Sequence, residues 1–170
     1  MRKQKGFSLI ELLIVVAIIL IIAAIAVPNL LRSRIAANEA SAVNSLRMIN
    51  TAEITYASTN PTIGFAPDLA TLGPGLAVGA PASPTNAALL DDVVGKASPG
   101  GAGLGNPNPK SGYNLYIGGV SGVNPVSTYS AHADPIIQGQ TGMRFFFVDT
   151  SGVIRYNVTQ AASTIDSSIQ

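Results

Sequence analysis

The sequence predicts an α+β fold in which a long N-terminal α-helix packs against a C-terminal antiparallel β-meander. Three observations lead to this prediction. Residues 29–60 contain neither Gly nor Pro and repeat apolar side chains at helical spacing. Residues 60–110 hold eight of the 11 prolines and nine of the 17 glycines, a composition typical of a long irregular connection. After residue 110, short runs of alternating apolar and polar residues between turns predict strands.

Length and composition exclude several classes of function. The chain has 170 residues, which predicts one compact domain with an appendage. A formal net charge of +1 gives no basic patch for nucleic acid, and the absence of Cys excludes disulfides, a zinc knuckle and a thiol nucleophile. His132 is the single histidine, so neither a multi-histidine metal site nor a conventional Ser/His/Asp enzyme is expected. We expect no catalysis, no metal, no cofactor and no small-molecule substrate.

The N-terminus reads as a membrane-spanning segment. Residues 12–31 are 20 consecutive uncharged and mostly aliphatic residues, the length that crosses about 30 Å of hydrocarbon as a helix. Arg2, Lys3 and Lys5 precede this run and favour an N-terminus that stays in the cytoplasm. An ordinary secretory signal would be shorter and would end at a small-residue cleavage site, so that reading is the weaker one.

Glu11 is anomalous because it lies inside an apolar stretch that begins at Phe7. A charge deep in a bilayer costs about 2.5–3.5 kcal/mol on insertion scales, and such a residue normally has a partner. Glu11 could lie near the headgroups and reach water. Alternatively, cleavage after Gly6 would give Phe7 a free α-amino group, a cation four positions before Glu11.

The run Lys5-Gly6-Phe7-Ser8-Leu9-Ile10-Glu11-Leu12-Leu13-Ile14-Val15-Val16 resembles the processing site of the type IV pilin family. The resemblance implies that a prepilin peptidase cuts between Gly6 and Phe7 and methylates the new N-terminal Phe7. It also implies that Glu11 is the assembly glutamate, which pairs with the N-terminal amine of a neighbouring subunit. Pro28 matches a proline that kinks the family's helix, whereas Leu20 stands where the family often has glycine.

The two halves of the expected helix should lie in different surroundings. Residues 7–57 would span roughly 77 Å at 1.5 Å per residue, about twice what a membrane needs. The first half is uniformly apolar, whereas the second is amphipathic, and its apolar face combines Leu31, Ile35, Ala42, Leu46, Ile49 and Tyr56. Pro28 should bend the helix or leave backbone carbonyls unpaired. In pilins the connection that follows the helix contacts neighbouring subunits, and we expect the same here.

These boundaries divide the chain into a leader at residues 1–6, a membrane and assembly segment at 7–31 and a soluble domain at 32–170. Within the soluble domain we expect the helix to about residue 58, the connection at 59–110 and the sheet at 111–160. Loss of three leader cations leaves seven basic side chains (10 − 3) against nine acidic ones, a net charge of −2. The basic leader would then serve only to set topology.

The connection and the sheet give more specific expectations. Short helical turns are predicted at residues 67–72, closed by Gly73, and at residues 87–94, closed by Gly95. Four strands are predicted, and a frayed tail follows them at residues 161–170. The predicted strands are residues 113–117, which end at Gly118-Gly119, residues 127–133, residues 143–148 and residues 153–158.

Three other patterns invite chemistry but have simpler interpretations. Ser130, His132 and Asp134 share a strand face, where side chains point out in parallel, so a solvated face is the better reading. Asp91-Asp92 lacks the alternating acidic spacing of a calcium loop. Residues 145–147 are three Phe, and we expect them to pack in the core except for one exposed ring.

The expected function is that of a structural subunit of a type IV pilus. Its partners would be copies of itself in a filament, the prepilin peptidase, the assembly machinery of the inner membrane, and membrane lipid before assembly. The precursor would be a single-pass inner-membrane protein, and the product an extracellular filament. The alternatives are a pseudopilin of a type II secretion system, a minor pilin, and a membrane-tethered binding domain that does not polymerise.

Overall fold

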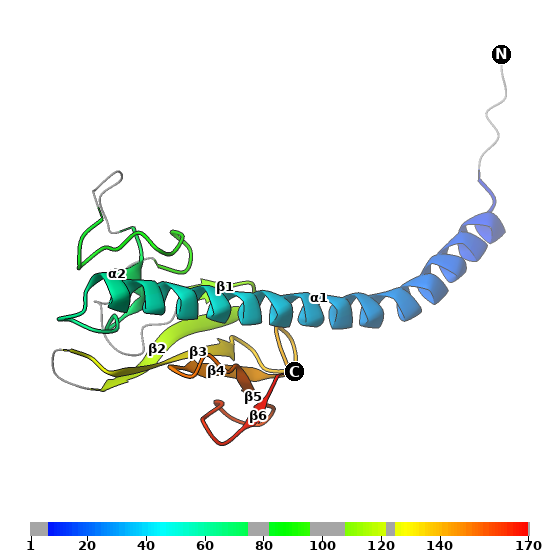
Figure 1. Cartoon of the computed structure of the whole chain (residues 1–170). Coiled ribbons are helices and arrows are strands. Elements are labelled where there is room, and N and C mark those ends of the chain that lie inside the picture. The colour runs from blue at the N-terminus through cyan, green and yellow to red at the C-terminus, as the bar shows by residue number, and fades with distance from the viewer. Residues whose placement is uncertain (1–6, 75–81, 96–107, 122–124, 170) are drawn as a thin grey trace, which may run out of the picture. The chain divides into compact units, whose positions relative to one another are not determined.

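The computed structural model describes residues 7–74, 82–95, 108–121 and 125–169. Contacts between residues divide the chain into two compact units, Met1–Arg34 and Ile35–Gln170. Figure 1 shows the elements in chain order. They are α1 (Leu9–Thr59), α2 (Leu69–Leu72), β1 (Asn108–Lys110), β2 (Tyr113–Ser121), β3 (Thr128–Pro135), β4 (Phe145–Asp149), β5 (Arg155–Asn157) and β6 (Ser167–Ser168).

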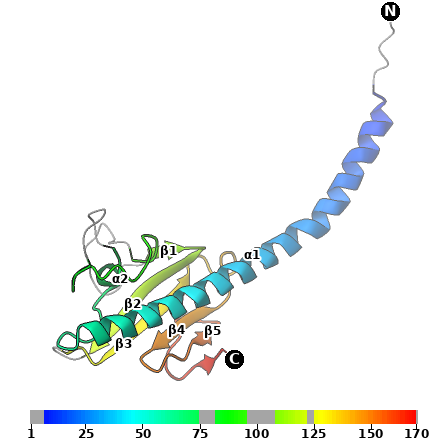
Figure 2. The ribbon, with the colours of Figure 1, turned by 45° about the horizontal axis from the view of Figure 1, so that its top comes forward.

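Helix α1 is the long helix that the sequence predicts, shifted by two residues at each end. Within the unit Ile35–Gln170, its inner face buries the predicted apolar positions from Ala42 onward, including Leu46, Ile49 and Tyr56. Ile35 is only half-buried. The spacing of four, three and seven residues keeps these side chains on one face of the helix, where they pack against the sheet. Figure 2 shows this part of α1 lying along the strands, as does Figure 1.

The sheet is an antiparallel meander with strand order β1-β2-β3-β4-β5-β6, which confirms the predicted α+β architecture. Six strands form it instead of the predicted four. Its inner face supplies Tyr113 and Leu115 from β2, Ala131 and Ala133 from β3, and Phe146 and Val148 from β4. Together with Leu72 and Val94 from the connection, these side chains form a single core against α1.

Strand β2 continues through Gly118-Gly119, where the sequence predicts its end. The pairing with β3 shifts register between Ile117 and Gly119, so Gly118 occupies a bulge. A Cβ on Gly118 would lie 2.4 Å from the His132 ring, whereas Gly itself leaves the ring room. Gly118 therefore leaves room for the His132 ring of β3, and the double glycine does not end the strand.

The C-terminal tail is ordered, so the prediction of a frayed end is wrong for the described residues 161–169. The Asp166 carboxylate accepts hydrogen bonds from the Ser163 backbone N–H at 2.7 Å and from Asn157 Nδ2 at 2.9 Å. β6 pairs with β5, and Ala162 is buried. Ser-rich sequence has weak strand preference, so only tertiary contacts could order this segment.

Of the two predicted helical turns, only the first is a helix. Asp68 caps α2 by accepting the Thr71 backbone N–H at 2.8 Å, and Gly73 closes it. The second prediction, at residues 87–94, is wrong for its first half, because Ala87 N–H donates to the Thr71 carbonyl and Leu90 N–H to the Leu72 carbonyl. A single turn remains, closed by Gly95 N–H on the Asp91 carbonyl at 2.8 Å.

Within the unit Ile35–Gln170, two carboxylate side chains of α1 bind segments outside the helix. Glu39 accepts the Met143 backbone N–H at 3.0 Å and binds the Arg144 guanidinium through Nε at 2.8 Å and Nη2 at 2.7 Å. Glu53 is fully buried and accepts the Ala66 backbone N–H at 2.8 Å. The first contact holds the β3–β4 loop and the second holds the start of the connection.

Candidate processing and assembly segment

The N-terminal end of α1 holds the residues for which the sequence predicts processing and assembly. Gly6 lies outside the described residues, and Phe7 is the first described residue, 93% exposed. The Ser8 backbone N–H donates to Glu11 Oε2 at 2.8 Å, and Leu12 N–H donates to the Ser8 carbonyl at 3.3 Å. Ser8 is thus the N-cap residue of a helix that begins at Leu9, and Glu11 is its third residue.

This geometry gives Glu11 a local partner that sequence reasoning missed. A Glu three residues after an N-cap Ser closes half of a capping box, because its carboxylate reaches back to the N-cap N–H. A negative charge in the first turn is also favoured by the helix dipole. The Ser-x-x-Glu spacing of Ser8 and Glu11 is the sequence signal for this contact. One N–H occupies only part of the capacity of a carboxylate, which can accept about four hydrogen bonds.

The large apolar side chains between Phe7 and Leu31 are exposed in the single chain, from 93% at Phe7 to 44% at Leu31. Among the described helices, α1 is the one long and apolar enough to cross a membrane by length and composition, and nothing in its most apolar window is buried. Exposed apolar surface on this scale needs lipid or another protein surface to cover it.

Pro28 lies within α1, and the helix continues through it. Pro has no N–H to donate to the carbonyl four residues earlier, that of Ala24, so this carbonyl loses its usual helical partner. One turn later, Ser33 Oγ donates to the Asn29 carbonyl at 3.0 Å, a back-bond that often accompanies helix bending. The bend expected at Pro28 stays a prediction.

The strand face with Ser130, His132 and Asp134 is a packed aromatic cluster, not the solvated face that the sequence predicts. The His132 ring stacks on Tyr116 with centroids 5.1 Å apart and meets the Phe147 ring edge-on at 5.1 Å. Tyr116 Oη donates to Asp134 Oδ2 at 2.6 Å, and burial lowers the pKa of His132. The Asp134 carboxylate therefore binds the Tyr116 hydroxyl, and Ser130, His132 and Asp134 do not form a hydrogen-bonded relay.

The remaining candidate sites also have structural roles. Asp91 accepts the Val94 backbone N–H at 2.8 Å and pairs with Lys110 at 3.3 Å, and the Val94 hydrogen bond is the main cause that lowers the pKa of Asp91. No group of three potential metal ligands occurs among the described residues. Of the three consecutive Phe, Phe146 and Phe147 are buried and Phe145 is half-buried, so none is the exposed ring that was expected.

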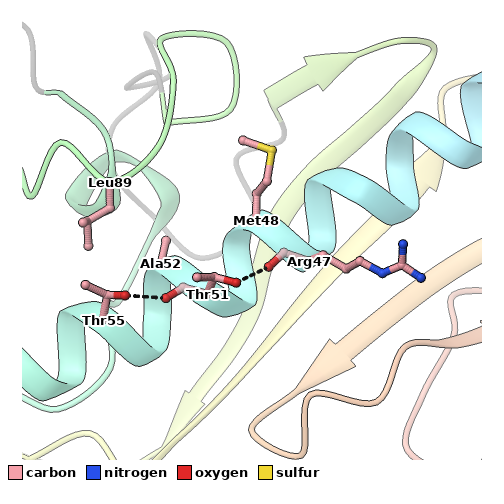
Figure 3. Close-up of a pocket in the computed structure, with 6 residues that line it drawn as sticks. All are labelled: Arg47, Met48, Thr51, Ala52, Thr55 and Leu89. Carbon is pink, nitrogen blue, oxygen red and sulfur yellow. Dashed lines mark hydrogen bonds between the residues drawn. The ribbon is translucent and has the colours of Figure 1, made fainter.

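A shallow cavity of about 350 Å³ lies on the outer face of α1 beside Leu89 (Figure 3). Its hydroxyls are engaged within the helix, since Thr51 Oγ1 donates to the Arg47 carbonyl at 3.0 Å and Thr55 Oγ1 to the Thr51 carbonyl at 2.8 Å. Arg47 is the single ionisable residue of its lining. The cavity therefore offers neither an acid–base pair nor a nucleophile.

Comparison with known proteins agrees with the N-terminal pattern. Residues 1–27 match the family model described as the prokaryotic N-terminal methylation motif. The chain is 40% identical over 73 residues to the type IV major pilin protein PilA of Myxococcus xanthus, covering 39% of this chain and 33% of the relative. It is 64% identical over 39 residues to the type IV wide pilus major component PilA4 of Thermus thermophilus, covering 23% of this chain and 30% of the relative.

The chain therefore carries the methylation motif of type IV pilins, and major pilins are among its relatives. It matches about a third of the length of these curated relatives. No solved structure matches the chain. The long helix and the antiparallel sheet agree with the α+β pilin fold.

Proposed function

We propose that this chain is the precursor of a type IV pilus subunit, which is cleaved between Gly6 and Phe7, methylated on Phe7 and polymerised into a helical filament. The observation that carries the proposal is the coincidence of the methylation motif with a helix that starts at Leu9 and bears Glu11 in its first turn. The precursor is held in the inner membrane by its apolar segment. The assembled filament lies outside the cell.

The apolar segment supports both states of this life cycle. As a precursor, residues 12–31 are covered by lipid hydrocarbon, which they are long enough to cross. In a filament the same side chains are covered by the helices of neighbouring subunits. No catalytic step by the chain itself is needed, because the prepilin peptidase performs the cleavage and the assembly machinery lifts the subunit from the membrane.

Glu11 sets the axial register in this proposal. After cleavage, the carboxylate pairs with the Phe7 amine of a neighbouring subunit while its bond to its own Ser8 N–H persists. A buried charge without its partner costs several kcal/mol, so every other stagger of the helices is disfavoured. The Phe7 amine is also close to Glu11 of its own chain, because Ser8 is the next residue. An ion pair between Glu11 and its own Phe7 amine therefore competes with the ion pair between Glu11 and the Phe7 amine of a neighbouring subunit.

The relatives favour a filament-forming pilin over the neighbouring alternatives. Both relatives are major pilus components by description, whereas a type II secretion pseudopilin or a minor pilin would share the processing but form a short or scarce product. A tethered binding domain that never polymerises leaves the Gly6-Phe7 site without a role and gives Glu11 only its hydrogen bond with the Ser8 N–H.

Mass spectrometry of the N-terminal peptide tests the proposal on sheared surface material and on membranes. We expect abundant sheared protein that begins at methylated Phe7. A processed peptide found only in membranes would favour the pseudopilin or minor pilin, and a chain that begins at Met1 everywhere would favour the tethered domain.

Two substitutions at Glu11 separate its charge from its capping role. Glu11→Gln keeps an oxygen for the Ser8 N–H but cannot form an ion pair with an amine, whereas Glu11→Ala loses both interactions. Quantification of sheared filaments should show that both variants are processed and that neither assembles. Filaments formed by Glu11→Gln at wild-type abundance would show that charge pairing is not the basis of assembly.

A further inference from the structure

The loop between β3 and β4, residues 136–144, exposes apolar side chains without an apparent fold-stabilising use. Ile136, Ile137 and Met143 are 47%, 49% and 51% exposed. No charged residue lies between Pro135 and Arg144. Gln138 Nε2 donates to the Val158 carbonyl at 2.6 Å, which brings a fourth exposed apolar residue beside the loop. Clustered exposed apolar side chains of this kind mark interaction surfaces.

Hydrogen bonds within the loop and packing against the core hold the backbone that carries these side chains. Gly139 N–H donates to the Gly142 carbonyl at 2.8 Å, and Thr141 N–H donates to the Ile137 carbonyl at 3.0 Å. Gly142 packs so closely on buried Tyr113 that a Cβ there would lie 1.9 Å from the phenolic oxygen. Display from a hydrogen-bonded turn costs little ordering entropy on contact with a partner.

The same loop is fastened to the part of α1 that follows the apolar segment. Asn38 Nδ2 donates to the Thr141 carbonyl at 2.9 Å, and Glu39 binds the backbone N–H groups of Met143 and Arg144 at 3.0 and 3.3 Å. Asn38 follows Leu31 by seven residues, which span at most about 25 Å even when fully extended. When residues 12–31 cross a bilayer, the loop is therefore tethered within reach of its surface.

We propose that this loop is a membrane-interface contact of the precursor, in which Ile136, Ile137 and Met143 enter the headgroup layer of the bilayer. The inference rests on the proposed function, because it requires the apolar segment to be inserted. Arg32 and Arg34 lie between the span and the loop attachment, and both are exposed. Arg guanidinium groups bind phosphate in a bidentate geometry, so these two side chains draw the neighbouring surface toward the lipid headgroups.

The alternative occupant of this surface is a second copy of the chain. Lipid is favoured because the seven residues from Leu31 to Asn38 keep the loop attachment within about 25 Å of the membrane-spanning segment in every precursor molecule, whatever its concentration. The one charged side chain of the loop, Arg144, is bound by Glu39, so no free charge is left to set the register or orientation of a protein partner, whereas a headgroup layer requires none.

Site-specific fluorescence tests the contact with the full precursor, because the natural chain contains no Cys to interfere with labelling. An environment-sensitive NBD label is placed on Ile137→Cys. Val153→Cys, an apolar position of 37% exposure that follows the other end of β4, is the matched control, and Ile22→Cys marks insertion. The precursor is reconstituted in phosphatidylethanolamine–phosphatidylglycerol vesicles that carry lipid-attached spin-label quenchers.

We expect a shallow quencher to reduce Ile137→Cys fluorescence at least twofold more than that of Val153→Cys, at every protein-to-lipid ratio. Equal quenching at these two positions, with Ile22→Cys quenched by a deep probe, would overturn this inference and leave the proposed function intact. Lack of quenching at Ile22→Cys would overturn both. Shielding of Ile137→Cys that rises with protein density, without lipid quenching, would assign the surface to a second copy.

Discussion

Glu53 is a carboxyl group buried without a cation. Its side chain receives one hydrogen bond, from the Ala66 N–H, and Oε1 has no hydrogen-bond partner among the described residues. Burial raises the pKa of Glu53 from 4.5 to about 8, and the nearby Asp68 carboxylate adds to the rise. Tyr56 and Tyr129 lie close enough for Glu53 to raise the pKa of each phenol. In the folded chain, Glu53 is therefore a neutral acid near pH 7.

The free energy of unfolding should fall as the pH rises from about 4.5 to about 8. In this window the folded chain holds a proton that the unfolded chain has released, so stability declines by up to about 1.4 kcal/mol per pH unit. Below the window both states are protonated, and above it both are ionised. Thermal unfolding of the full chain in detergent should show this slope, and Glu53→Gln should flatten it. Parallel curves for the two proteins would contradict the assignment.

Gly118 and Gly119 are adjacent in β2 but differ in what they can accept. A Cβ on Gly118 would meet the His132 ring at 2.4 Å, whereas a Cβ on Gly119 would lie 3.5 Å from Ser130 Oγ, an ordinary contact. Tyr116 and Phe147 flank the His132 ring and limit its movement. Gly118→Ala should destabilise the fold by roughly 1–3 kcal/mol through overpacking, and Gly119→Ala should cost less.

Chemical denaturation midpoints of both alanine variants, measured on full-length protein in detergent, check this prediction. A His132→Ala background should relieve most of the cost of Gly118→Ala, because it removes the ring that the new methyl group meets. If Gly118→Ala and Gly119→Ala lower the unfolding free energy equally, the loss comes from the backbone freedom of glycine and not from packing against His132.

At the scale of elements, the joint between α1 and the β3–β4 loop depends on Glu39. Glu39→Ala leaves the Met143 N–H and the Arg144 guanidinium without their acceptor, and we expect a loss of about 2–3 kcal/mol. Glu39→Gln keeps an acceptor for the backbone N–H and should lose about half as much. Denaturation midpoints of the two variants give the comparison. If Glu39→Gln is as costly as Glu39→Ala, the ion pair with Arg144 dominates the joint.

The elements that could be predicted from the sequence are those set by local periodicity. The bounds of α1 follow from an uninterrupted helical pattern, and the four central strands follow from alternation between turn signals. β6 and the ordered tail could not be predicted, because Ser167 and Ser168 pair with β5, and no alternation or turn signal in the tail indicates that pairing. The continuation of β2 past its glycines depends on a ring from another strand.

The candidate sites also divide into features that a local sequence pattern predicts and features that depend on tertiary contacts. The residue types of the segment, Phe7 and Glu11 above all, could be recognised from the sequence because the methylation motif at residues 1–27 is a linear pattern. The Ser8 N–H that donates to the Glu11 carboxylate is a local backbone group, and the Ser-x-x-Glu spacing was the available signal. The aromatic stack around His132 joins three strands, so no local pattern could distinguish it from a solvated face.

At the scale of the whole molecule, the two compact units have opposite solvent requirements. All of the buried hydrophobic side chains that form the core lie in the unit Ile35–Gln170, whereas the unit Met1–Arg34 exposes its apolar side chains. The fold of the larger unit therefore has no structural need for the smaller one. The described residues 7–34 of the smaller unit, in contrast, form no core, and their apolar side chains require lipid or another protein surface to cover them.

A fragment of residues 35–170 should consequently fold by itself in buffer without detergent. We expect a monomer by light scattering, with a thermal midpoint within about 5 °C of the full chain in detergent, since a shift of this size corresponds to only about 1–2 kcal/mol at this length. The full chain should precipitate or aggregate when detergent is removed. Mixed with assembling full-length subunits, the fragment should not enter filaments, because it lacks the segment that carries Phe7 and Glu11. Incorporation of the fragment would place the assembly surface in the soluble unit and would overturn the role proposed for the N-terminal helix.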